Sequence, residues 1–391
     1  MNRRDVLQSL GGVGALALSP ATGFALDRGT APRVVVIGAG IMGVSIAYHL
    51  AKAGARVVVL ERVSPGSQAT QGAFAMLIAT HEGSDKAFND LYGHAIDDWR
   101  RLEAELGGAV QVQWGGAATW AAPGAKGDEL AAVTHQLRGW DAPIETLTAE
   151  RLKQLVPGIV PGPFGAGNFS PHQGTLDPMQ ALAALVAAAR RRGVEFRVPC
   201  EAAAFTVDGR VVTGVQTSHG PVEADMVVAA AGAATPGLAR MVGAKAPIKL
   251  VSGTLAHSKP FPHVLERVLN GPLGSLKQDP DGRIVTGADY RPGASGADVS
   301  RGYGEQLLAT AAQVVPALKG AQLDAMTLGY VPIPVDTRPI VGFCAAPANL
   351  YLALTMSGIT MAPLIGRLAA REILEGAGVD LLADYRPARF A

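Results

Sequence analysis

Residues 33–62 read RVVVIGAGIMGVSIAYHLAKAGARVVVLER, and this stretch predicts the fold. It begins with a β-branched run typical of a strand that is buried on both faces. Gly38, Gly40 and Gly43 follow in the pattern G-x-G-x-x-G. In this pattern the first glycine permits a tight turn, the second lets the backbone approach a pyrophosphate, and the third lets the next helix pack on the strand. We expect that helix, residues 42–53, to present its N-terminal amides to the phosphates.

A second buried strand, residues 56–60, ends in Glu61 and Arg62. A carboxylate about 20 residues beyond the glycine motif accepts hydrogen bonds from ribose hydroxyls and repels a 2′-phosphate. Strand, motif, helix, strand and acid in this order predict a dinucleotide-binding α/β domain. They do not distinguish FAD from NAD.

The composition excludes several classes of protein. The 391 residues include 34 Lys and Arg against 33 Asp and Glu, so no basic excess points to nucleic acid. With 48% hydrophobic residues the chain can bury a large core, which argues against disorder. Cys200 and Cys344 are too few for a disulfide scaffold, and we expect both to be buried and inert. The eight histidines are scattered without metal-ligand spacing, so we predict no metal site.

Residues 1–25 are similar to a twin-arginine export signal. Arg3 and Arg4 precede an apolar run, residues 6–18, that is too short to span a bilayer, and Asn2 stands where such signals usually carry Ser or Thr. We therefore expect a periplasmic protein that uses the twin-arginine machinery, which carries folded, cofactor-loaded proteins. The alternative is a frayed apolar terminus of a cytoplasmic protein. We expect no membrane span in the mature chain.

Two further segments are candidates for contact with a nucleotide. Small residues after the second strand, residues 67–72, form a loop that can follow a pyrophosphate and flavin, although a plain surface loop is the alternative. A predicted strand, residues 226–230, runs into Ala231 and Gly232, where the backbone can approach a ligand at the carboxyl end of a parallel strand. Between these segments, Asp177 as N-cap and Gly193 as stop predict a helix.

The last informative stretch predicts a strand, residues 350–354, followed by a helix. Ser357 and Gly358 precede the helix, and we expect Pro363 in its first turn, where its missing amide does no harm. The helix N-terminus would then face whatever lies above the sheet. If that is the pyrimidine edge of a flavin, the helix dipole would stabilise the anionic reduced ring. An ordinary capped helix is the alternative.

Six stretches together resemble the FAD-dependent D-amino-acid oxidase superfamily, which includes glycine oxidase and sarcosine oxidase. The stretches are residues 34–54, 67–76, 171–178, 227–239, 329–343 and 349–363. The resemblance implies a glutathione-reductase-like FAD-binding Rossmann domain with an inserted α+β substrate domain, built on a mostly antiparallel sheet. The FAD-binding domain would comprise residues 31–106, 160–245 and 328–391. The substrate domain would comprise residues 107–159 and 246–327, with a hairpin at residues 279–282.

On this resemblance the cofactor is FAD. The residues expected to bind it are Gly38, Gly40, Ile41, Met42, Gly43, Glu61, Arg62, Ser67, Gln68, Ala69, Thr70, Ala202, Ala231, Gly232, Gly342, Ser357, Gly358, Ile359 and Thr360. The cysteine that links flavin covalently in sarcosine oxidases would fall near Gly329, so we expect non-covalent FAD.

The chain departs from the resemblance where the substrate should bind. Val331 stands where many amino-acid oxidases of this group carry an arginine that clamps the substrate carboxylate. Simple α-amino acids are therefore disfavoured unless Arg338 or Lys277 supplies the charge. Lys277 is also a candidate for dioxygen activation, but we expect it to be an exposed strand lysine. The residues expected in the substrate pocket are Phe74, Met76, His81, Lys277, Gln278, Tyr290, Tyr330 and Met356, the last standing where many relatives carry histidine.

The chemistry that the resemblance implies is hydride transfer from the carbon of a neutral amine to the flavin, giving an imine that water hydrolyses. Dioxygen or a quinone would then accept the electrons, and no protein acid or base is predicted. We therefore expect an oxidase or dehydrogenase of a small amine or N-substituted amino acid. The alternatives are an FAD-dependent 2-hydroxy-acid dehydrogenase, a flavin-binding protein that has lost catalysis, and an NAD-dependent dehydrogenase.

Overall fold

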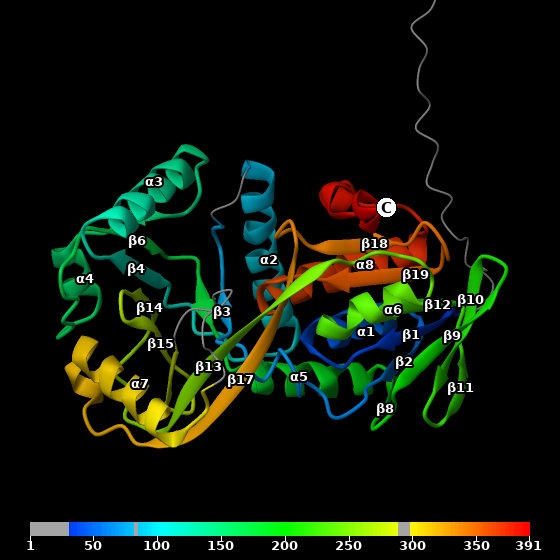
Figure 1. The fold of residues 1–391 in the computed structure, drawn as a ribbon, viewed down its shortest axis with the longest axis horizontal. Helices are drawn as coiled ribbons and strands as arrows, with labels where there is room; N and C mark the ends of the chain where they lie inside the picture. The colour runs from blue at the N-terminus through cyan, green and yellow to red at the C-terminus, as the bar shows by residue number, and fades with distance from the viewer. Residues whose placement is uncertain (1–30, 82–84, 288–297) are drawn as a thin grey trace, which may run out of the picture.

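A computed structural model describes residues 31–81, 85–287 and 298–391. The export-signal prediction and Tyr290 lie outside these residues. Figure 1 shows two regions, each built around a sheet. The first sheet has six strands, in the order β18 (Ile340–Phe343), β19 (Leu350–Leu354), β12 (Met226–Ala229), β1 (Arg33–Ile37), β2 (Arg56–Leu60) and β8 (Glu195–Arg197). Every neighbouring pair in it is parallel except β18 with β19.

The six-stranded sheet is covered by helices on one face and by a small sheet on the other. Val34 and Val36 of β1 pack among the helices, whereas Val35 and Ile37 point to the opposite core. This alternation is what a strand buried on both faces requires. The covering helices are α1 (Ile41–Lys52), α2 (Lys86–Glu105), α5 (Pro178–Arg191) and α8 (Gly358–Glu375). The opposite core includes α6 (Thr235–Arg240), β9 (Ala202–Asp208), β10 (Val211–Thr217) and β11 (Gly220–Glu223).

The second sheet has eight strands and forms the other region. Its order is β17 (Leu323–Pro334), β13 (Ile248–Pro260), β16 (Arg283–Gly287), β15 (Gly274–Gln278), β14 (Val268–Gly271), β4 (Ala117–Ala121), β6 (Ala166–Ser170) and β5 (Glu145–Thr146). Only β14 and β4 pair in parallel, so the expectation of a mostly antiparallel sheet is confirmed. The helices of this region are α3 (Ala125–Gly139), α4 (Ala149–Leu155) and α7 (Arg301–Val314). A two-stranded sheet pairs β3 (Met76–Leu77) antiparallel with β7 (Gly174–Thr175).

Several local expectations are confirmed. The Asp177 side chain accepts hydrogen bonds from the amides of Met179 (2.7 Å) and Gln180 (3.0 Å), and so caps α5 as its sequence predicts. Strands β15 and β16 flank the predicted hairpin. Short 3-10 helices also lie at residues 232–234, 316–318, 380–385 and 387–390.

One expectation is wrong. Pro363 is not in the first turn of α8 but in its sixth position, inside the helix. The eight-stranded sheet also takes in β6 and the end of β17, residues 328–334, which the expected boundaries assign to the FAD-binding domain. The division into domains remains a prediction.

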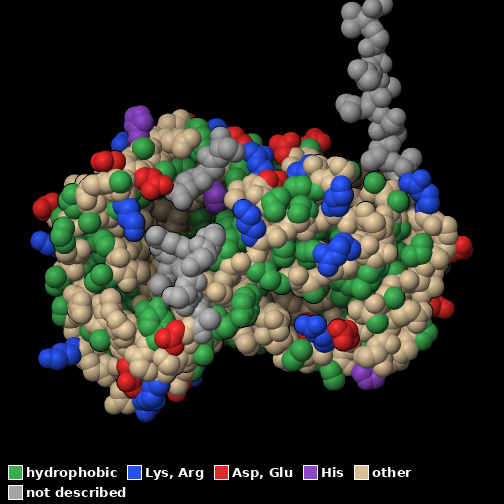
Figure 2. Space-filling view, in the orientation of Figure 1, with side chains coloured by type: hydrophobic (Ala, Val, Ile, Leu, Met, Phe, Trp, Pro, Cys, Tyr) green, Lys and Arg blue, Asp and Glu red, His purple; other side chains and the backbone are tan. Residues whose placement is uncertain are grey.

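The surface carries no field of a single charge sign on the face seen in Figure 2. Basic and acidic side chains are interspersed there among hydrophobic and neutral ones, as the balance of 34 basic and 33 acidic residues leads one to expect. Among the described helices, none is both long and apolar enough to cross a membrane.

Candidate active site

A cavity of about 850 Å³ lies at the carboxyl ends of the parallel strands, where open α/β sheets bind ligands. Its volume is in the range of cofactor sites, roughly 300–1,000 Å³. The predicted site residues that line it are Gly38, Gly40, Ile41, Met42, Glu61, Arg62, Ser67, Gln68, Ala69, Thr70, Ala202, Ala231, Gly232, Tyr330, Met356, Gly358 and Ile359. Residues far apart in the sequence are thus brought to one cavity.

The three glycines of the motif have separate structural reasons. Gly38 has φ of +107°, and a Cβ on it would lie 2.6 Å from the carbonyl oxygen of Ala230. A Cβ on Gly43 would lie 2.0 Å from the Gly38 oxygen, so Gly43 serves helix packing and does not line the cavity. A Cβ on Gly40 would meet only the Thr70 hydroxyl, at 3.5 Å. Gly40 therefore leaves space on the cavity side, where a pyrophosphate needs it.

Glu61 is held in place by the backbone. Its Oε2 accepts from the amide of Ala39 and its Oε1 from the amide of Val63, each at 2.9 Å. A carboxylate has about four acceptor sites, so Glu61 retains capacity for the ribose hydroxyls that the sequence predicts. Arg62, beside it, pairs with Glu201 at 3.5 Å.

The loop at residues 67–70 is fixed against the start of α1. The Thr70 hydroxyl is buried and accepts from the amide of Ile41 at 3.2 Å. The Ser67 hydroxyl lines the cavity, is buried, and has no hydrogen-bond partner in the described part of the chain. A buried hydroxyl without a partner costs free energy unless a ligand satisfies it. Ser67 therefore fits a phosphate oxygen, and these residues fit a dinucleotide.

The start of α8 forms another part of the wall through Gly358 and Ile359. Because Pro363 has no amide, the Ile359 carbonyl lacks its usual donor four residues on. Trp99 of α2 supplies one: its Nε1 donates to the carbonyl oxygens of Ile359 and Thr360, both at 3.0 Å. Helix α2, which is distant in the sequence, thus supplies a hydrogen-bond donor in place of the amide that Pro363 lacks.

Strands β13 and β17 complete the wall with Ile248, Leu250, Tyr330 and Pro332. Leu250 pairs with Pro332 across the two strands. Gly329, where the resemblance places a flavin-linking cysteine, lies against the backbone of Gly72. A Cβ on it would be 2.5 Å from the Gly72 oxygen, so no side chain fits there.

Three other residues expected to bind the cofactor have contacts away from the cavity. Thr360 is buried, and its hydroxyl donates to the Met76 carbonyl and accepts from the Ile78 amide, each at 3.2 Å. The Ser357 hydroxyl lies 2.9 Å from the phenolic oxygen of Tyr92. Gly342 has φ of +137° and faces the Arg386 side chain.

Most of the expected substrate-pocket residues also lie outside the lining. Gln278 is buried, and its amide is committed: Oε1 accepts from the amides of Val264 and Leu265, and Nε2 donates to three carbonyls. His81 stacks on Tyr92, with ring centroids 4.6 Å apart. Met76 Sδ lies 3.5 Å from the Asn270 amide nitrogen, and the ring of Phe74 lies 5.7 Å from Lys277 Nζ.

Lys277 and Arg338, the two candidate partners for a substrate carboxylate, are engaged elsewhere. Lys277 is only 1% exposed, so it is not an exposed strand lysine. Its Nζ donates to the Leu176 carbonyl at 2.7 Å and pairs with Asp279 at 2.6 Å. Arg338 forms an ion pair with Asp85 at the N-terminus of α2. Neither side chain lines the cavity.

Sequence reasoning missed part of the lining. Cys200 and Glu201 lie beside Arg62, and the backbone amide of Cys200 donates to the Glu61 carbonyl at 2.7 Å. Cys200 and Cys344 are both buried and free, as expected. The remaining missed residues on the α6 side of the cavity are Ala233, Ala234, Pro236, Gly237, Leu238, Arg240 and Met241. The stretch 227–239 contained the signal for α6, but Ile248 and Leu250 reach the cavity only through pairing with β17.

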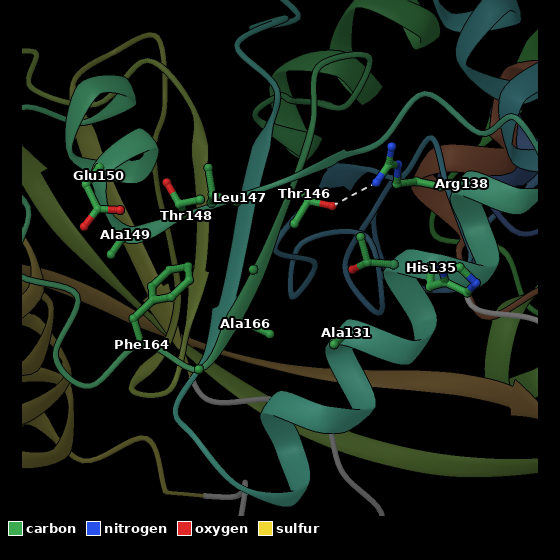
Figure 3. A pocket seen from close by; sticks show the side chains of 13 residues that line it. Ala131, His135, Arg138, Thr146, Leu147, Thr148, Ala149, Glu150, Phe164 and Ala166 are labelled. Atoms are coloured by element: carbon green, nitrogen blue, oxygen red, sulfur yellow. Dashed lines mark hydrogen bonds between the residues drawn. The ribbon is translucent and has the colours of Figure 1, made fainter.

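A second cavity, of about 550 Å³, lies in the other region among α3, α4 and β6. Figure 3 shows its side chains, including Arg138, which donates to the Thr146 hydroxyl at 3.3 Å. None of the predicted site residues lines it. The described residues also contain no cluster of His, Cys, Asp or Glu able to hold a metal ion.

Comparisons with known proteins support the assignment of the first cavity as a cofactor site. Human dimethylglycine dehydrogenase is 27% identical over 386 residues, which cover 91% of this chain and 44% of that protein. The 4-methylaminobutanoate oxidase (formaldehyde-forming) of Paenarthrobacter nicotinovorans is 28% identical over 369 residues, covering 88% of this chain and 44% of that protein. The chain thus spans less than half the length of these two relatives.

The likeness of this chain to a solved structure covers nearly the whole fold. Glycine oxidase from Geobacillus kaustophilus superposes with a TM-score of 0.83 at 25% identity, covering 92% of this chain and 99% of that one. The family model described as FAD dependent oxidoreductase (DAO) matches residues 33–372. The chain belongs to this family of FAD-dependent oxidoreductases, and its cofactor is FAD.

Proposed function

We propose that the protein oxidises the C–N bond of a small amine or N-substituted amino acid. The observation that carries this proposal is the single cavity that joins the glycine motif to the start of α8 and to β17. Such a cavity holds an extended dinucleotide along the sheet and leaves its far end to a substrate. The relatives' names, which include a dimethylglycine dehydrogenase and a 4-methylaminobutanoate oxidase, support amines as substrates.

When bound, FAD supplies a hydride acceptor. The chain's own residues then have three tasks. Ser67 and the amides at the start of α1 would hold the pyrophosphate, and Glu61 would hold the ribose. Tyr330 and Met356 line the cavity and would position the substrate's C–H bond. Water hydrolyses the imine product, so no described residue needs to act as acid or base.

The wall favours an amine without an α-carboxylate over a simple α-amino acid. Val331 lines the cavity where a carboxylate-binding arginine would stand, and an apolar side chain cannot replace a two-pronged donor. Lys277 is already paired with Asp279, and Arg338 with Asp85. Each of these two side chains would have to break its ion pair in order to bind the carboxylate of a substrate.

The test is anaerobic bleaching of the bound flavin by a panel of N-methylated amines, N-methylated amino acids, simple amino acids and 2-hydroxy acids. We expect N-methylated compounds to bleach the flavin, with release of a smaller amine and an aldehyde. Bleaching by 2-hydroxy acids alone would replace this proposal with C–O oxidation. If dithionite bleaches the flavin but no compound of the panel does, the protein would be a flavin-binding protein without catalysis.

We also propose that FAD is bound non-covalently, because Gly72 leaves no room for a side chain on Gly329. Acid precipitation of the protein is expected to release all the flavin into the supernatant. A pellet that stays yellow would contradict this.

We further propose export by the twin-arginine machinery to the periplasm, with dioxygen or a quinone as electron acceptor. The support is the Arg3-Arg4 pair and the apolar run after it. Lysine at both positions is expected to retain the protein in the cytoplasm of a host that has the machinery. Unchanged fractionation would contradict export, and oxygen uptake against quinone reduction would separate the two acceptors.

A further inference from the structure

The first turn of α8 has no side-chain cap. Ser357 is its N-cap by backbone, since its carbonyl accepts from the Met361 amide at 2.9 Å, but its hydroxyl accepts from no amide. Serine normally caps a helix by accepting from the second or third amide. Here these are the amides of Ile359 and Thr360, for which no acceptor is found among the described residues.

The Ser357 hydroxyl is instead directed to Tyr92 of α2, 2.9 Å away. Tyr92 is 1% exposed and packs against the rings of His81, at 4.6 Å, and Phe88, at 5.5 Å. Burial raises the pKa of Tyr92 to about 12, so its phenol stays protonated at neutral pH. Met356 and Gly358 line the cavity, whereas Ser357 between them does not.

We propose that Tyr92 is a positioning residue of the flavin site: by holding the Ser357 hydroxyl, it keeps Ser357 from capping α8 and leaves two amides uncapped, of which that of Ile359 belongs to the wall of the cavity. This inference rests on the proposed function, because it places the pyrimidine edge of the flavin at the start of α8. Amides and a helix dipole aimed at that edge stabilise negative charge on it. Tyr92 therefore favours the reduced, anionic ring without touching it.

A merely structural role for Tyr92 makes a different prediction. Trp99 already attaches α2 to the first turn of α8 through two hydrogen bonds. If Tyr92 only added to this attachment, its hydroxyl would affect the stability of the protein and leave the flavin's electronic properties unchanged.

The experiment measures sulfite binding to the FAD-loaded full chain. Sulfite donates an electron pair to N5 of oxidised flavin, and the resulting negative charge is delocalised toward the pyrimidine edge. Its Kd, read from the loss of flavin absorbance, therefore reports on the amides without any substrate. In Tyr92→Phe the released Ser357 hydroxyl is expected to cap α8. We expect the sulfite Kd to rise by about fivefold, with a lower midpoint potential of the flavin.

A double variant separates capping from loosening of the site. In Tyr92→Phe with Ser357→Ala no hydroxyl is left to cap the helix, so the sulfite Kd is expected to return to within about twofold of the wild type. Tyr385→Phe is the matched control, because Tyr385 is also buried and also contacts Phe88, whereas the Ser357 hydroxyl is bonded to Tyr92. It is expected to leave the sulfite Kd unchanged.

An unchanged Kd in Tyr92→Phe, or a double variant as weak as the single one, would overturn the inference. If Tyr92→Phe does not retain FAD, Ser357→Ala alone carries the test: a raised sulfite Kd in it would show that the hydroxyl itself serves the flavin. Protein that binds FAD and sulfite as expected, but whose flavin no amine bleaches, would contradict the proposed function and leave this inference standing.

Discussion

The two ends of the cavity are assembled in different ways. At the glycine-motif end, the hydrogen bonds of Glu61 with Ala39 and of Thr70 with Ile41 join residues 22 and 29 positions apart. At the α8 end, they join residues far apart, with separations of 265 positions between Tyr92 and Ser357 and 260 between Trp99 and Ile359. The first end is therefore specified locally, whereas the second exists only once α2 has packed on α8.

This difference predicts different sensitivities. The local end depends on backbone that a single Cβ would displace. The α8 end depends on buried side chains of α2 that supply hydrogen bonds the helix lacks. Substitutions at the first end should therefore act through backbone that both the fold and the cofactor need, and those at the second should act through buried hydrogen bonds of α2.

The largest effect is expected from Gly43→Ala. Its Cβ would lie 2.0 Å from a backbone oxygen, which cannot move aside without breaking the turn of the motif. We expect a loss of more than about 3 kcal/mol in the free energy of unfolding and no retained FAD, measured by urea denaturation and by flavin absorbance.

Gly40→Ala is the matched control for this clash. Its Cβ meets only the Thr70 hydroxyl at 3.5 Å, so the FAD-free protein should unfold at nearly the wild-type urea concentration while FAD binds more weakly. Equal destabilisation by both substitutions would show that the two glycines do not have the separate roles assigned to them.

The local end could be predicted from sequence because each of its signals is short. The strand at residues 56–60, the capped helix after Asp177 and the strand at residues 350–354 all appear where their patterns place them. Buried β-branched runs, a capping aspartate and glycines act within a few residues. The family resemblance then supplied the antiparallel sheet, which no local pattern indicates.

The α8 end could not be predicted in the same way. Pro363 reads as a first-turn proline, and its true place inside α8 is tolerated only because Trp99 donates to the freed carbonyl. The sequence favours an exposed Lys277, which is wrong: only the packing of β15 shows that Lys277 is buried beside Asp279. Such long-range compensation leaves no spacing or periodicity in the sequence.

The next largest effect is expected on the pH dependence of stability, and it involves strand β13. β13 carries Ile248 and Leu250 at the cavity and continues to His257. Burial, together with the charges of Lys277 and Arg283, lowers the pKa of His257 to about 4, against the opposing effect of Asp177 and Asp324.

Because the folded pKa of His257 is depressed below that of the unfolded chain, the unfolded state binds more protons between pH 6.5 and 4. The protein should therefore lose stability as the pH falls through this window, on the order of 2 kcal/mol from this residue. His257→Gln is expected to flatten the difference in unfolding free energy between pH 7 and pH 4.5. Parallel profiles for the two proteins would contradict the assignment.

Trp99→Phe tests the compensation at α8. The substitution keeps an aromatic ring but removes the donor shared by the carbonyls of Ile359 and Thr360. Leaving a buried acceptor without a partner costs about 1–3 kcal/mol, and we expect a loss of about 2 kcal/mol in urea denaturation. Adding Pro363→Ala restores an amide to α8, so the double variant should recover part of the loss. No recovery would show that the damage comes from ring packing.

The smallest effect is expected where the loop at residues 67–70 meets α1. Thr70→Val keeps the shape of the side chain but leaves the buried amide of Ile41 without its acceptor, which should cost about 1 kcal/mol in unfolding free energy. Thr70→Ser keeps the hydroxyl and loses only a methyl group. If the hydrogen bond holds the loop, Thr70→Ser should retain both stability and FAD affinity better than Thr70→Val. The reverse order would mean that the methyl group, packed beside the motif, holds the loop. The glycine-motif end would then depend on side-chain packing, as the α8 end does.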